Sequence, residues 1–168
     1  MTALLPVSGP GTEQDTVVYV VVFPEGLLVV RHAASGCEPL DDEDVPPYQA
    51  GLWSAVADDV DPDRHEVNGI ALDGDLRAKL ADAADTTPAE YSDNPVATRM
   101  PLALGAEPQP RRGAVAIVAE EDPQTGLTGS LSAGQLALIV QTHQTALLPA
   151  TGRSRRKQIA REVPAVDR

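Results

Sequence analysis

The sequence is poor in cysteine and in aromatic residues. It has 168 residues, one of them cysteine, and phenylalanine, tryptophan and tyrosine together make up only 3%. A single cysteine excludes an intramolecular disulfide, and nothing in the sequence requires an oxidising compartment. Because aromatic rings are so few, the core has to be built from Val, Leu, Ile and Ala. We therefore expect an aliphatic core held by many small contacts.

Long apolar runs are also missing. No stretch approaches the ~20 apolar residues that a membrane-spanning helix needs. The first fifteen residues, MTALLPVSGPGTEQD, lack the cationic start and the long apolar centre of a secretory signal peptide. We therefore expect a cytoplasmic protein without membrane contact. The length favours one domain rather than two.

The pattern near the N-terminus predicts a β-hairpin. Residues 16–23 and 27–31 are rich in β-branched residues, and Phe23-Pro24-Glu25-Gly26 stands between them. Proline presets φ early in a turn, and glycine accepts the positive φ near its end. The first strand is apolar at consecutive positions, so we expect both of its faces to be covered.

Further elements follow from spacing and caps. An apolar stripe predicts a helix that begins at Pro47 and carries Tyr48, Leu52, a largely buried Trp53, Val56 and Val60. Short strands are predicted over 67–72 and 114–119, an extended segment over 96–104, and a helical turn from a capping box over 87–90. Asp73 or Asp75 could cap a helix with Leu76 and Leu80 on its apolar face. Ser132 and Gln135 form a capping box for a helix over 132–148 that carries His143.

These elements predict an α+β fold: a small mixed sheet that opens with the hairpin, with helices packed mainly on one face. We expect a flexible N-terminal arm over 1–15 and a single domain over 16–149. That domain would contain a proline-rich loop at about 92–112. Residues 150–168 are expected to form a basic, disordered tail.

Charge is divided unevenly along the chain. The formal net charge is −12, although residues 150–168 hold six cations and two anions. The candidate binding residues in this tail are Arg153, Arg155, Arg156, Lys157 and Arg161. Such a cluster is most often a solvated tail without a partner, and the alternatives are contact with phosphates or with an acidic protein partner. It holds no aromatic residue for base stacking, so sequence-specific reading is not implied.

Catalytic and metal-binding patterns are weak. Cys37 and His32 are five residues apart, and a cysteine nucleophile needs a nearby base, but no flanking motif supports the pair. The acidic cluster Asp58, Asp59, Asp61 and Asp63 fails as a calcium loop, because Arg64 stands where glycine is needed and Ile70 where glutamate is needed. His32, His65 and His143 share no zinc spacing, and no phosphate-binding loop is present. We therefore expect no metal and no cofactor.

Together these features favour a small acidic interaction or regulatory accessory protein that acts by binding a protein partner, without catalysis. The alternative is a nucleic-acid-associated accessory factor that contacts phosphates through the basic tail. A second alternative is an enzyme with a Cys37/His32 site. The sequence does not indicate the oligomeric state.

Overall fold

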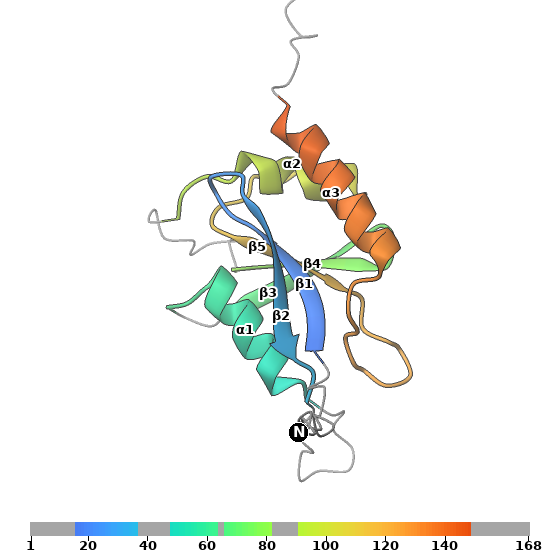
Figure 1. Cartoon of the computed structure of the whole chain (residues 1–168). Helices are drawn as coiled ribbons and strands as arrows, with labels where there is room; N and C mark the ends of the chain where they lie inside the picture. Colours follow the sequence, from blue (N-terminus) through green and yellow to red (C-terminus); the bar gives the residue numbers. More distant parts are fainter. Residues whose placement is uncertain (1–15, 37–47, 64–65, 82–90, 149–168) are drawn as a thin grey trace, which may run out of the picture.

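A sheet lies between two helical layers (Figure 1). The structure, a computed structural model, describes residues 16–36, 48–63, 66–81 and 91–148. In chain order these form β1 (Thr16–Val22), β2 (Leu28–Ala34), α1 (Ala50–Val60), β3 (Val67–Leu72), β4 (Leu76–Ala81), α2 (Pro95–Ala103), β5 (Val115–Ala119) and α3 (Ala133–Leu147). The strand order is β2-β1-β5-β4-β3. The α+β class is therefore confirmed.

The predicted hairpin is confirmed in β1 and β2. Phe23 N–H donates to Leu27 O and Gly26 N–H donates to Phe23 O, both at 2.9 Å. Gly26 has φ +84°, which a side chain would strain. The returning strand is longer than expected, because β2 continues past Arg31 to Ala34 and so contains His32.

A second hairpin replaces a predicted helix. The segment after Asp73 forms β4, whereas Leu76 and Leu80 suggested a helical face. The turn is compatible with a hairpin, since Gly74 and Asp75 both have positive φ, at 79° and 55°, and Gly-Asp is one of the residue pairs found in hairpin turns. Ala78 lies between the two leucines on the same buried face of the strand.

All strand pairs are antiparallel, so the expectation of a mixed sheet was wrong. Two local hairpins supply β1, β2, β3 and β4. The fifth strand, β5, runs between them and pairs antiparallel with both β1 and β4. Short turns can join only antiparallel neighbours, which accounts for four of the five strands.

Successive side chains of β1 point to opposite faces of the sheet and pack into two separate hydrophobic cores. Val20 and Val22 face α2 and α3, whereas Tyr19 and Val21 face α1. Two of the three helices of the described residues, α2 and α3, thus share one face, and α1 covers the other (Figure 1). Aliphatic side chains dominate both clusters.

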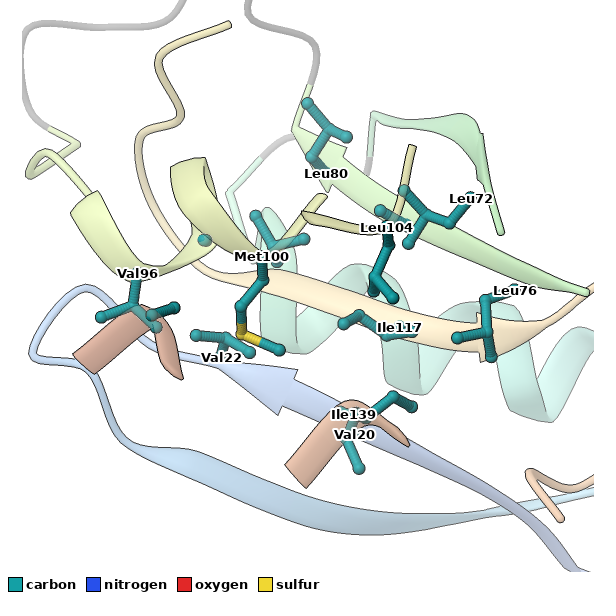
Figure 2. Packing of buried hydrophobic residues seen from close by; sticks show 14 of the residues in the cluster. Val20, Val22, Leu72, Leu76, Leu80, Val96, Met100, Leu104, Ile117 and Ile139 are labelled. Atoms are coloured by element: carbon teal, nitrogen blue, oxygen red, sulfur yellow. The ribbon is translucent and has the colours of Figure 1, made fainter. Parts of the chain in front are cut away.

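The proline-rich region contains a helix where an extended segment was expected. Residues 95–103 form α2, which begins after Asn94 with Pro95 in its first turn. The side-chain Oδ1 of Asn94 accepts from Ala97 N–H at 2.8 Å, which caps the helix. Figure 2 shows Met100 of this helix extending into the cluster towards Val22. Burial of Met100 offsets the unfavourable proline inside the helix, Pro101.

The other two helices match their patterns closely. α3 has the predicted capping box, with both Ser132–Gln135 hydrogen bonds formed. α1 begins at Ala50 rather than Pro47, and Trp53 is only partly buried. The ring of Trp53 lies beside β4, with Lys79 Nζ 4.4 Å from its centroid. In the part of the chain that is described, every helix is too short or too polar to cross a bilayer.

Candidate interaction surface

The predicted site residues do not assemble into one place. Arg153, Arg155, Arg156, Lys157 and Arg161 lie outside the described residues, as do Cys37 and His65. His32 is exposed on β2. The tail and the Cys37/His32 pair therefore remain predictions from sequence.

The aspartates that end α1 bind protein groups. Asp59 accepts from Tyr19 Oη at 2.8 Å and from Arg31 Nη2 at 2.9 Å. Asp61 is buried and accepts from Tyr91 Oη at 2.5 Å and from Glu66 N–H at 3.3 Å. Through these hydrogen bonds, the two carboxylates connect the end of α1 to β1, to β2 and to the loop residues Glu66 and Tyr91. No group of three or more metal-ligating side chains is found among the described residues.

Burial and the adjacent Asp59 carboxylate also determine the protonation state of Tyr19. Desolvation raises the pKa of its phenol above the usual value, and the hydrogen bond to Asp59 raises it further. Tyr19 is therefore a neutral donor at physiological pH. The same carboxylate balances the charge of Arg31, the only charged residue of β2.

One edge of β2 has no neighbouring strand among the described residues. β2 is an outer strand of the sheet, next to β1. Val18 of β1 donates its N–H to Ser130 Oγ and accepts from Leu131 N–H, both at 3.0 Å, so its backbone points away from β2. Backbone directions alternate along an antiparallel pair, and Val18 lies opposite His32. The N–H and C=O groups of Leu28, Val30 and His32 therefore point outwards.

The outward groups belong to residues whose side chains face α3. Val30 lies opposite Val20, and Leu28 opposite Val22, and both β1 partners belong to the core under α2 and α3. Val30 is nevertheless 48% exposed. The outer edge of β2 thus combines outward-pointing backbone N–H and C=O groups with an exposed apolar side chain, Val30.

One flank of α3 faces the β1–β2 turn. His143 Nε2 lies 2.8 Å from Gly26 O in this turn, so the histidine is hydrogen-bonded and partly buried. Leu147 Cδ2 lies 3.3 Å from where a Cβ on Gly26 would stand. Val140 shares this flank at helical spacing, and it is 41% exposed, whereas Leu147 is 50% exposed. We call Leu27, Leu28, Val30, Val140 and Leu147 the β2 edge surface.

The opposite edge strand is better protected. β3 contains Asn68 and Gly69, and Ala71 is the one apolar side chain of this strand that is exposed. Arg77 Cδ and Lys79 Nζ both lie 3.2 Å from a Cβ position built on Gly69. Cations beside an edge discourage pairing with another strand. β2 contains a single cation, Arg31, whose charge is balanced by Asp59.

Sequence reasoning did not find this surface. The apolar run of the hairpin was evident, but an outer strand and a central strand have the same composition here. The signal lies in the strand order, which depends on β5 joining β1 on the side away from β2.

Comparison with known protein families, with curated proteins and with solved structures finds no match for this chain. The functional argument therefore depends on the chemistry of the described residues and on the charge pattern of the sequence.

Proposed function

We propose that this protein is a small accessory module that binds a protein partner, without catalysis, and that the partner adds an extended apolar strand to β2. The observation that carries the proposal is that no strand of the described residues pairs with the outward backbone of Leu28, Val30 and His32, which lies beside exposed apolar side chains. Strand addition to a sheet edge is a common mode of protein recognition, in which backbone hydrogen bonds give affinity and side chains give specificity.

The surface chemistry supports a protein strand over a charged ligand. Arg31, the only charged side chain in β2, already has Asp59 as its partner. An apolar strand can cover Val30 and Leu27 without leaving a charge unpaired. The absence of catalysis is proposed from the sequence, which contains none of the nucleophile or phosphate-loop spacings considered above.

The test compares capture from native lysate by the wild-type chain and by a Val30→Lys variant. The matched control is Leu102→Lys on α2, because Leu102 is 49% exposed and the change in charge is the same. The wild-type and control chains should retain the same identified partners, and Val30→Lys should lose them. Partners retained by Val30→Lys would refute binding at this edge.

A second candidate function is binding of nucleic acid through residues 150–168. It is supported by the six cations that the sequence places there. Phosphate contacts release counterions, so binding should weaken steeply as salt increases. Deleting residues 150–168 should abolish binding of a DNA or RNA duplex, and equal binding by the truncated chain would exclude this function.

A further inference from the structure

We infer that the partner at the β2 edge surface is a second copy of this chain, whose β2 pairs antiparallel with the first across a two-fold axis. This inference rests on the proposed function, because it names the occupant of the same surface. When an edge strand pairs antiparallel with the same strand of a second copy, one symmetric contact supplies backbone hydrogen bonds to both copies. The result would be a continuous ten-stranded sheet, five strands from each copy.

The register follows from the direction of the backbone groups. Only residues whose N–H and C=O groups point outwards can exchange hydrogen bonds, so an axis near the middle of β2 passes through Val30, Arg31 or His32. An axis at Arg31 would set two guanidinium groups side by side, and an axis at His32 would set two imidazole rings opposite one another, whereas two valines pack well as a cross-strand pair. An axis at Val30 sets Val30 opposite its copy and Leu28 opposite the second His32. We therefore place the axis at Val30.

The same symmetry brings the α3 flanks together. A two-fold axis perpendicular to the sheet keeps α3 of both copies on the same side. Leu147 and His143 on one flank of α3 lie against Gly26 in the β1–β2 turn, and Val140 shares that flank at helical spacing. The side chains of Val140 and Leu147 are both substantially exposed in the single chain. Pairing would cover them together with Val30, which explains why apolar residues gather on both elements.

Charge also favours this seam over other faces of an acidic protein. Two chains with a formal charge of −12 each repel one another. β2 contains no acidic residue, and Asp59 neutralises Arg31 within the chain. The contact itself is therefore apolar. The repulsion between the two acidic chains is long-range and opposes association. Added salt screens that repulsion, so the dimer should become tighter as salt increases.

The available area is sufficient for a weak dimer. Seven residues of β2 extend about 24 Å, and a sheet layer with one helix layer is about 20 Å deep. The contact would thus remove about 500 Å² from each copy, or about 1,000 Å² in total, close to the lower limit for specific interfaces. We expect reversible association rather than an obligate dimer.

Analytical ultracentrifugation of the full chain, from low to several hundred micromolar, tests the inference. The wild-type and Leu102→Lys chains should change from monomer to dimer over this range, more readily at higher salt. Val30→Lys should stay monomeric while its circular dichroism remains that of the wild type. A wild-type chain that is monomeric throughout, a dimer that weakens with salt, or a dimeric Val30→Lys would overturn it.

Hydrogen exchange of the wild-type chain gives a test without substitutions. The amides of Leu28, Val30 and His32 should exchange freely in dilute solution and become protected as concentration rises. Exchange that does not depend on concentration would overturn the inference. A monomeric wild-type chain that still captures a different protein through Val30 would refute the second copy but leave the proposed function intact.

Discussion

Asn94 offers a sharp test of how β1, β5 and α2 are held together. It is fully buried, and its side chain makes three hydrogen bonds to three separate segments. Nδ2 donates to Val22 O at 3.1 Å and to Gly113 O at 2.9 Å, and Oδ1 accepts from Ala97 N–H at 2.8 Å. A single amide thus links the end of β1, the start of β5 and the first turn of α2.

The cost of Asn94→Ala can be worked from these bonds. Loss of a helix cap costs about 1 kcal/mol. Removing the donor from two buried carbonyls costs about 1 kcal/mol each or more, because water cannot easily replace it. The free energy of unfolding should therefore fall by about 3 kcal/mol, a large share of the 5–15 kcal/mol typical of a domain.

Urea denaturation followed by circular dichroism measures this loss. Asn94→Ser is the matched control, since its hydroxyl can still accept from Ala97 N–H but cannot reach both carbonyls. It should recover about 1 kcal/mol of the loss caused by alanine. If Asn94→Ala lost less than about 1 kcal/mol, the side chain would not join the three segments and the reasoning would be refuted.

Two further substitutions probe the two cores. Tyr19 has a raised pKa in the folded chain, so the stability from its neutral phenol is present below about pH 10 and is lost as pH rises above it. Urea midpoints between pH 8 and about pH 11 should therefore fall more in the wild type than in Tyr19→Phe, and parallel curves would contradict the assignment. Met100→Ala should cost about 2–5 kcal/mol, because Met100 is fully buried under α2, whereas Met100→Leu should cost less than about 1.5 kcal/mol. Equal unfolding free energies for these two variants would show that the site tolerates a cavity.

Local signals predicted those parts of the fold that depend on few residues. The Pro-Glu-Gly turn identifies the first hairpin, and the Ser132–Gln135 box fixes the start of α3. In each case the residues that make the deciding hydrogen bonds are neighbours in sequence. No distant partner is needed to select the conformation.

The errors occurred where two conformations had similar local support. Leu76 and Leu80 fit one face of a helix, and with Ala78 they also fit one face of a strand. Pairing with β5 favours the strand, and that partner lies about forty residues further along. In α2, the prolines suggested a loop, but the Asn94 cap and the burial of Met100 favour a helix. Tertiary contacts decided both segments.

The candidate site was even less accessible from the sequence. Nothing near Val30 shows that β2 lies at an edge, because that follows from the position of β5. The exposed flank of α3 comes from residues more than a hundred positions away. The basic tail, in contrast, is evident from composition alone, and its role stays a prediction.

The central position of β5 has a consequence for how the chain folds. Each hairpin can close over a short loop, but β5 must find β1 across about ninety residues before the two halves share one sheet. During synthesis, a chain that ends before Gly113 already holds both hairpins and leaves the facing edges of β1 and β4 without a partner. We expect joining these halves to be the slow step, and the time before β5 arrives to be when the nascent protein is most prone to pair with the wrong strand.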